Sequence, residues 1–235
     1  MENDYQAWLS RWPLAVIMIV IASWLFYRYA APQRWREWAG AGLVQAFIIA
    51  LYAEMYGFPL TIYVLTSFLG IEIPGVHYSG HLWATLLGYG YVGAMVEMFL
   101  GVTFVILGIL MLMEGWRELY RAVQENRLAT EDLYGVVRHP QYTGIFGALF
   151  GQLVHWPTIP TLVLFPVIVA IYVYLARKEE QQVIEQFGDE YRRYMHDVPM
   201  FFPRFGNWRR LLGAIGLLGH DKDAVRNDKK ADPGS

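Results

Sequence analysis

Hydrophobic and polar residues are segregated along this chain in long blocks rather than in short alternation. No charged residue occurs from Pro13 to Tyr27, and between Gly57 and Glu114 only Glu72 and Glu97 are charged. Uncharged apolar blocks of about 20 residues are typical of helices that cross a membrane. The pattern therefore predicts a helical integral membrane protein.

Five apolar segments make up the predicted membrane region. They cover Leu14–Tyr29, Ala39–Tyr56, Tyr91–Met113, Tyr142–Trp156 and Thr161–Ala176. The last two are short and are joined through Pro157 and Pro160, so we expect a helical hairpin there. Gly57 and Pro59 end the second segment, and Leu60 to Leu69 is expected to continue it as a half-helix or a re-entrant piece.

The chain becomes polar after the last apolar segment. Arg177 to His196 is helix-prone with apolar residues on one side, and Trp208 to Leu218 is a basic amphipathic stretch suited to a membrane surface. The charged residues from His220 to Ser235 predict a disordered tail. We therefore expect one all-α membrane domain over residues 1–219, with about five transmembrane helices followed by cytoplasmic amphipathic helices.

The basic residues predict how the helices are oriented. Arg residues follow the first and third segments, and Arg177 and Lys178 follow the hairpin, whereas the loops 57–90 and 155–160 contain neither Lys nor Arg. Loops rich in Lys and Arg stay in the cytoplasm. We expect the N-terminus outside, the C-terminus in the cytoplasm and, in a bacterium, insertion into the inner membrane.

Composition limits the chemistry and the partners. The 235 residues include no Cys, which excludes disulfides, thiolate nucleophiles and thiolate metal ligands. The net charge is −2, and no basic patch indicates a nucleic-acid surface. The expected partner is therefore the lipid bilayer, and the oligomeric state stays open.

Several polar residues away from the cytoplasmic loops are explained better by structure than by chemistry. Gly88–Gly93 matches G-x-G-x-x-G, but no predicted strand precedes it, so we expect close helix packing. His77 and His81 lie in a Gly-rich loop without a third ligand nearby in the sequence, and we expect no metal site. Glu54 and Glu97 lie towards the outer side and are expected to form hydrogen-bonded contacts between helices.

The first cluster with the character of a functional site covers Tyr134 to Gly144, Y-G-V-V-R-H-P-Q-Y-T-G. Pro140 suits the first turn of a helix, because its missing N–H would have no partner there. Such a helix start presents N–H groups and a positive dipole end, which favour a ligand with a carboxylate. Arg138 and His139 add donors, although a snorkelling Arg at a capped helix start is the structural alternative.

The second cluster begins where the last apolar segment ends. Glu179 and Glu180 are suited there to binding hydroxyl groups or an ammonium group, whereas a bare run of charges is more often a solvated helix surface. The basic residues predict that this pair and the first cluster lie on the same cytoplasmic side. A single site formed by both clusters requires that arrangement.

Taken together, the two clusters resemble a known family. R-H-P-x-Y-x-G, a helical hairpin, E-E, F-G-x-E-Y-x-x-Y and V-P follow one another between residues 134 and 203. This order is similar to that of the isoprenylcysteine carboxyl methyltransferases and the related phospholipid N-methyltransferases. The resemblance implies a membrane methyltransferase that uses S-adenosylmethionine and admits a lipophilic or small methyl acceptor through a lipid-facing opening.

The resemblance also assigns roles to individual residues. It implies that the cofactor is bound by Val137, His139, Pro140, Tyr142, Gly144, Glu179 and Glu180. A carboxylate acceptor would need a cation to position it, for which Arg138 and Arg177 are the candidates. An amine or a thiol would need a base, for which Glu180 and His139 are the candidates.

Two positions depart from the family pattern. The eukaryotic carboxyl methyltransferases have Arg where this chain has Leu175, five residues before the second Glu, and tend to have Gly where it has Asp132. Both departures are expected to affect the acceptor more than the cofactor. The resemblance favours carboxyl methylation, while phospholipid N-methylation and thiol S-methylation stay open. A membrane sensor or transport accessory without activity is the alternative of another class.

Overall fold

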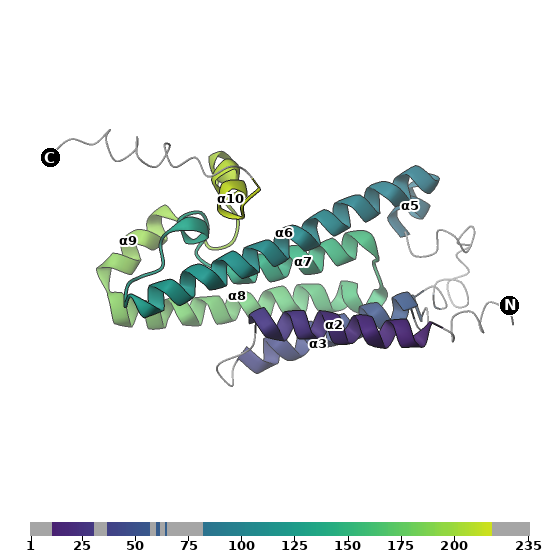
Figure 1. Ribbon diagram of the computed structural model, residues 1–235, viewed down its shortest axis with the longest axis horizontal. Coiled ribbons are helices and arrows are strands. Elements are labelled where there is room, and N and C mark those ends of the chain that lie inside the picture. Colours follow the sequence, from purple (N-terminus) through teal and green to yellow (C-terminus); the bar gives the residue numbers. More distant parts are fainter. Residues whose placement is uncertain (1–10, 31–36, 57–59, 62–63, 65–81, 218–235) are drawn as a thin grey trace, which may run out of the picture. The chain divides into compact units, whose positions relative to one another are not determined.

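The protein is described by a computed structural model, which covers residues 11–30, 37–56, 60–61, 64 and 82–217. Within these ranges it is helical and contains no strand, which confirms the predicted all-α class (Figure 1). The count of five membrane spans stays a prediction. Most of the expected half-helix at 60–69, the loop with His77 and His81, and the tail 220–235 lie outside the described residues.

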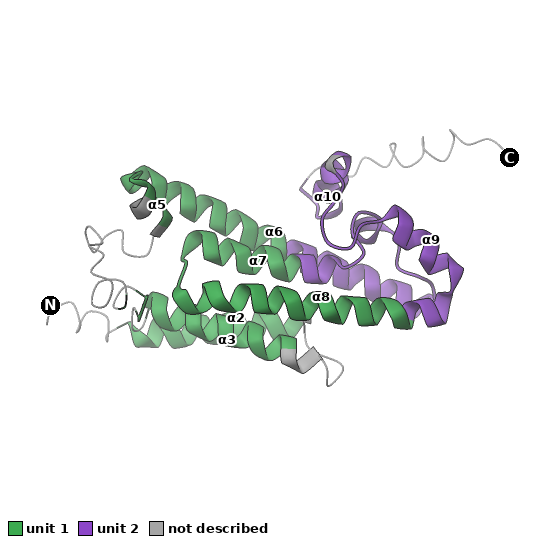
Figure 2. Cartoon of the chain, turned by 180° about the vertical axis from the view of Figure 1, so that it is seen from behind, with its two compact units in different colours: residues 1–109, 144–182 green, residues 110–143, 183–235 purple. Residues whose placement is uncertain are grey.

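The chain forms two compact units that alternate along the sequence. The first comprises residues 1–109 and 144–182, and the second comprises residues 110–143 and 183–235 (Figure 2). Neither unit is a continuous stretch of chain, because α6, α7 and α8 each have residues in both.

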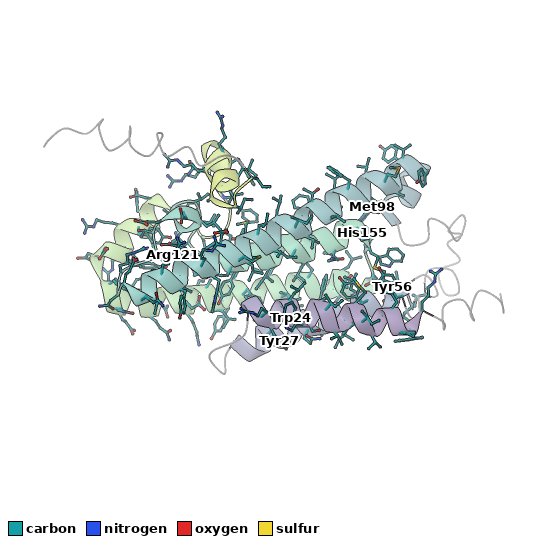
Figure 3. All side chains as sticks on the ribbon, in the orientation of Figure 1. Trp24, Tyr27, Tyr56, Met98, Arg121 and His155 are labelled. Atoms are coloured by element: carbon teal, nitrogen blue, oxygen red, sulfur yellow. The ribbon has the colours of Figure 1, made fainter. Side chains whose placement is uncertain are left out.

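The first unit contains a pair of apolar helices, α2 (Trp12–Ala30) and α3 (Glu37–Tyr56), which lie side by side (Figure 1). Gln45 Nε2 on α3 donates a hydrogen bond to Ser23 Oγ on α2 over 2.8 Å. Large apolar side chains remain exposed along α2, including Trp24, which is 62% exposed (Figure 3). An exposed apolar surface of this extent indicates contact with lipid.

Two helices are long and apolar enough to cross a membrane by length and composition. They are α6 (Gly90–Gln124) and α8 (Ile159–Phe187), while α2 and α3 contain the shorter apolar stretches Trp12–Arg28 and Gly40–Tyr56. α7 (Pro140–His155) has 16 residues, about 24 Å at 1.5 Å per residue, against a hydrocarbon layer of about 30 Å. The long apolar helices and the exposed apolar faces indicate a membrane protein.

Two helices continue well beyond their apolar segments. α6 was expected to end near Met113 but runs to Gln124, and α8 passes Ala176 without a break and runs to Phe187. The apolar pattern marks where lipid contact ends, whereas the backbone hydrogen bonds continue, because Glu, Gln, Lys and Arg are good helix formers. Gly188, with φ 57°, separates α8 from α9 (Asp189–Asp197).

The second unit is built around the end of α6. Tyr134 of the short 3-10 helix η2 (Asp132–Gly135) packs with Ala122 and Ala129 in a small apolar core. The 3-10 turn η3 (Phe205–Asn207) leads into α10 (Trp208–Ala214), which packs against η2. The predicted amphipathic stretch therefore forms a short helix, and its position at the membrane surface stays a prediction.

The G-x-G-x-x-G sequence forms a turn and a helix contact. Gly88, in the turn after α5 (Leu82–Leu87), and Gly90, the first residue of α6, have φ values of +71° and +56°, a conformation that favours glycine. A Cβ on Gly93 would lie 3.0 Å from the Cβ of Ala84 on α5. No strand precedes the motif in the described residues, so the expected packing role is confirmed.

The two buried carboxylates of the apolar helices bind backbone N–H groups of neighbouring segments. Glu54 Oε2 accepts a hydrogen bond from the Thr61 N–H over 2.9 Å, and Glu97 Oε1 accepts one from the Ala84 N–H. Thr61 Oγ1 in turn accepts a hydrogen bond from the N–H of Ile159, the first residue of α8, over 2.9 Å. These bonds confirm the predicted structural role of both glutamates.

α6 and α7 approach each other through glycines. A Cβ on Gly101 would lie 2.7 Å from the carbonyl oxygen of Gly151. A Cβ on Gly108, two turns further along α6, would lie 2.4 Å from the carbonyl oxygen of Gly144 and 2.6 Å from the Ala148 nitrogen. Only a residue without a Cβ permits this backbone contact.

The turn after α6 contains a buried ion pair. The Glu118 side chain on α6 is 2% exposed, and its Oε1 lies 2.9 Å from Arg127 Nη1. Arg127 also bonds to Glu125. These hydrogen bonds, with Glu125 and then with Glu118, raise the pKa of Arg127 above its ordinary value. A charged Arg127 thus fixes the chain between α6 and η2.

Replacement of Gly108 by Ala is expected to lower the Tm of the protein. The added Cβ would meet backbone atoms, and such overpacking costs about 1–3 kcal/mol. Gly42→Ala on α3 is the matched control, because no atom lies within 4 Å of its Cβ position, and Ala favours a helix over Gly by about 1 kcal/mol. Thermal unfolding in detergent, followed by circular dichroism, compares the two, and equal Tm values would contradict the close contact.

Replacement of Arg127 by Met is expected to destabilise the protein by about 3–5 kcal/mol, because it leaves the Glu118 carboxylate buried without its cation. Arg117→Met, which removes an exposed pair with Glu114, is the control and should cost less than about 1 kcal/mol. Denaturant unfolding measures the loss of stability in both variants. Glu118→Gln, added to Arg127→Met, should restore part of that loss because it removes the unpaired buried charge.

The pH dependence of the Arg127 contribution follows from the direction of its pKa shift. A raised pKa in the folded state means that the stabilisation is complete below the ordinary pKa of Arg in the unfolded chain and is lost only as pH rises through the folded value. The effect of Arg127→Met should therefore be equal at pH 6 and pH 9.

Candidate cofactor site

A distant segment of the chain binds the residues before α7. α7 begins at Pro140, as the sequence predicts. The Arg138 N–H donates to the Pro199 carbonyl over 2.9 Å, and the His139 N–H donates to the Met200 carbonyl over 3.1 Å. The two residues before α7 are therefore paired through their backbone with residues 199 and 200, which fixes the direction in which the chain enters the helix.

We call residues 198–201 the strap. A third bond ties it to α7, because Thr143 Oγ1 lies 3.1 Å from the carbonyl oxygen of Phe201 and donates to it. The Phe201 ring lies 5.7 Å from the His139 ring, and the His139 ring stacks on that of Tyr142 at 5.6 Å, with 3° between the planes. The buried His139 imidazole is thus in contact with two aromatic rings.

α9 is attached to the same segment by two side chains. Arg138 Nη1 donates to the carbonyls of Met195 and Val198, over 2.9 and 2.6 Å. A cation at the C-terminus of a helix also interacts favourably with the helix dipole. Tyr194 on α9 donates its hydroxyl proton to the carbonyl of Tyr134, over 2.6 Å. Arg138 of R-H-P-x-Y-x-G and Tyr194 of F-G-x-E-Y-x-x-Y therefore link α9 to the chain from η2 to the start of α7, within the second unit.

α6 supports the first turn of α7. The Tyr134 hydroxyl donates to Gln141 Oε1 over 2.9 Å, and Gln141 Nε2 donates to the Gly115 carbonyl over 3.3 Å. A Cβ on Gly115 would lie 3.1 Å from Pro140 Cγ. The helix start is thus held by α6, η2 and the strap, and a rigid helix start is suited to anion binding.

The predicted glutamates lie on a continuous part of α8 in the first unit. Glu180 is buried, Glu179 is half-buried and Arg177 is exposed. Leu175, which occupies the position of the family arginine, is also buried. This position therefore contributes an apolar side chain and no charge.

Two predicted cofactor residues have visible packing roles. Val137 is fully buried, and its N–H donates to the Leu133 carbonyl over 2.9 Å. The Gly144 carbonyl lies against Gly108 at the contact between α6 and α7. Their contact with the cofactor stays a prediction. Among the described residues, no three His, Asp or Glu side chains are grouped as metal ligands.

The backbone conformation at residue 132 explains why Asp can replace the glycine of the family pattern there. The φ of Asp132 is 47°, in the left-handed region that glycine adopts readily and that Asp tolerates better than most residues. The sequence could not distinguish this cause from an effect on the acceptor. The sequence also did not indicate Phe201 or Thr143 as site residues, because the motif pattern marks only Val198 and Pro199 of the strap.

Comparison with known proteins identifies relatives of low identity. The chain is 26% identical over 213 residues to a methanethiol S-methyltransferase of Pseudomonas deceptionensis, across 83% of this chain and 75% of that one. It is 38% identical over 85 residues to methanethiol S-methyltransferase 1 of Bradyrhizobium diazoefficiens, across 36% and 27%. It is 32% identical over 81 residues to the protein-S-isoprenylcysteine O-methyltransferase of Schizosaccharomyces pombe, across 34% of each chain.

The chain spans only 27% of the Bradyrhizobium relative and 34% of the Schizosaccharomyces relative. No family model and no solved structure matches it. The names of the relatives nevertheless agree with the family that the motifs resemble. The chain is thus similar, at low identity, to proteins named as methanethiol S-methyltransferases and as a protein-S-isoprenylcysteine O-methyltransferase.

Proposed function

We propose that this protein is a membrane-embedded methyltransferase that uses S-adenosylmethionine and methylates a small or lipophilic acceptor. The main support is the second unit, where Arg138, His139 and Thr143 of the first motif bond to the strap and α9. The methyltransferase homologues provide independent support. We treat residues 1–219 as one functional domain, because the two units are built from alternating segments.

The residues near the start of α7 match the chemical groups of S-adenosylmethionine. The N-terminus of α7 suits a carboxylate, and the His139 and Tyr142 rings suit an adenine base. We assign Glu179 and Glu180 to the ammonium group or the ribose hydroxyls. When bound, the cofactor supplies a methyl group on a sulfonium, which is already activated for displacement.

The chain itself must orient the acceptor and exclude water. A thiol acceptor loses its proton to a base, for which we propose His139 or Glu180. The acceptor sulfur then forms a bond to the methyl carbon while the sulfonium C–S bond breaks, which leaves S-adenosylhomocysteine. A carboxylate acceptor needs no base but requires a cation, for which Arg138 and Arg177 are the candidates.

Two observations favour a thiol over a carboxylate as acceptor. Two relatives that match more than four fifths of the chain are named for methanethiol. The position of the family arginine holds the buried Leu175, and Arg138 uses Nη1 to bind α9. Carboxyl methylation is the second candidate, since the motifs alone favour it.

We further propose that the reaction takes place on the cytoplasmic side of the membrane. Segments with many basic residues, 114–138 and 177–193, contain or adjoin the two motifs. The N-terminus then lies outside, and the C-terminus lies with the site in the cytoplasm.

Binding of S-adenosylmethionine tests the enzyme proposal directly. Calorimetry on the detergent-purified protein should show binding of S-adenosylmethionine and of S-adenosylhomocysteine. Glu180→Gln should weaken it about tenfold or more, as expected for a lost hydrogen bond to a charged group. His139→Ala should weaken it about tenfold, because the adenine base loses a stacked ring. Glu185→Gln, at an exposed position of α8, is the matched control and should bind like the wild type.

Two outcomes would contradict this proposal in different ways. Absence of binding by the folded wild-type protein would favour a membrane sensor or transport accessory. Wild-type affinity in both Glu180→Gln and His139→Ala would mean that the cofactor binds elsewhere.

The methylated product identifies the acceptor. With methyl-labelled cofactor and a mixture of methanethiol, a prenylcysteine and phospholipid, we expect the label in volatile dimethyl sulfide. Thiol methylation should also become faster as pH rises towards the thiol pKa, because the thiolate is the nucleophile. Label in a base-labile ester, with none in the volatile fraction, would reverse the order of the two candidates.

A further inference from the structure

The His139 imidazole is positioned by residues from two distant parts of the sequence. Tyr142 lies on the same helix turn and stacks on it at 5.6 Å. Phe201 comes from the strap, and its ring lies 5.7 Å from the imidazole at an angle of 40°. Ring pairs at such distances attract each other beyond their apolar contact, so removal of either ring should loosen the imidazole.

The strap holds Phe201 next to His139 through its backbone. The Met200 carbonyl, one residue before Phe201, accepts the His139 N–H. Thr143 Oγ1 lies 3.0 Å from the His139 carbonyl oxygen and 3.1 Å from the Phe201 carbonyl oxygen. Bonds on both sides of the Phe201 Cα therefore tie this residue to the backbone that carries His139.

The next residue along the chain has a different environment. Phe202 is 77% exposed, whereas Phe201 is half-buried. The two positions carry the same side chain on consecutive residues, and the ring contact with His139 belongs to Phe201. The burial of Phe201 thus results from a specific position on the strap and not from a general apolar surface.

We propose that Phe201 is a positioning residue for cofactor binding, which acts by holding the His139 ring. This inference rests on the proposed function, because it assigns His139 to the bound cofactor. A ring held between neighbours before the ligand arrives loses less conformational freedom on binding. Phe201 thereby contributes to affinity without being assigned a cofactor contact of its own.

The test compares four variants with the wild type. Phe201→Ala removes the ring, and Phe201→Leu keeps an apolar side chain of similar length if the alanine variant does not fold. Phe201→Tyr retains the ring, and Phe202→Ala is the matched control. Thermal unfolding shows which variants are folded, and calorimetry measures their Kd for S-adenosylmethionine.

A second measurement does not require the cofactor. Diethyl pyrocarbonate modifies accessible imidazoles, and mass spectrometry of the peptide with His139 follows its rate of modification in the apo protein. His139 is 8% exposed, so the wild type should react slowly. A looser ring should react several-fold faster in Phe201→Ala or Phe201→Leu.

We expect Phe201→Ala and Phe201→Leu to bind S-adenosylmethionine about five- to tenfold more weakly and to expose His139. Phe201→Tyr should restore affinity to within about twofold of the wild type, and Phe202→Ala should change neither quantity. Wild-type affinity and reactivity in Phe201→Leu, or equal losses in the Phe202→Ala control, would overturn the positioning role. Absence of cofactor binding by the wild type would instead overturn the proposed function and this inference with it.

Discussion

Arg138 joins two segments of the second unit that are far apart in the sequence: the start of α7, and α9 with the strap that follows it. Its backbone N–H pairs with the Pro199 carbonyl, and its guanidinium donates to the carbonyls of Met195 and Val198 at the end of α9. A guanidinium is suited to this task because it is always charged and carries several donors in one plane. Arg138 therefore bonds to both the strap and the end of α9, next to His139.

The acidic residues of the apolar helices obey a different constraint. A backbone N–H that is buried without an acceptor costs several kcal/mol, about the value of a lost hydrogen bond in an apolar medium. Glu54 and Glu97 accept such N–H groups from Thr61 and Ala84, which explains their presence. Glu180 lies on a continuous stretch of α8, whose backbone needs no such acceptor. Glu180 is buried there, and its contact with the cofactor stays a proposal.

The sequence predicted the elements whose cause is local, and it missed those whose cause is not. Blocks without charge located the apolar helices, and Pro140 located the start of α7 because its ring favours that position. The extension of α8 past Ala176 was missed, because hydrophobicity reports lipid contact and not backbone bonding. The strap was missed because its pairing with Arg138 and His139 uses backbone groups, which every residue has.

The two departures from the family pattern have different physical causes, and this difference bears on the acceptor. At Asp132 the left-handed φ of 47° explains why glycine and aspartate replace each other, so the change concerns the turn before the motif. At Leu175 a charge is replaced by a buried apolar side chain. A buried arginine requires an anionic partner, because an unpaired charge in an apolar environment is unstable. The leucine at this position therefore supports the proposed thiol acceptor over a carboxylate.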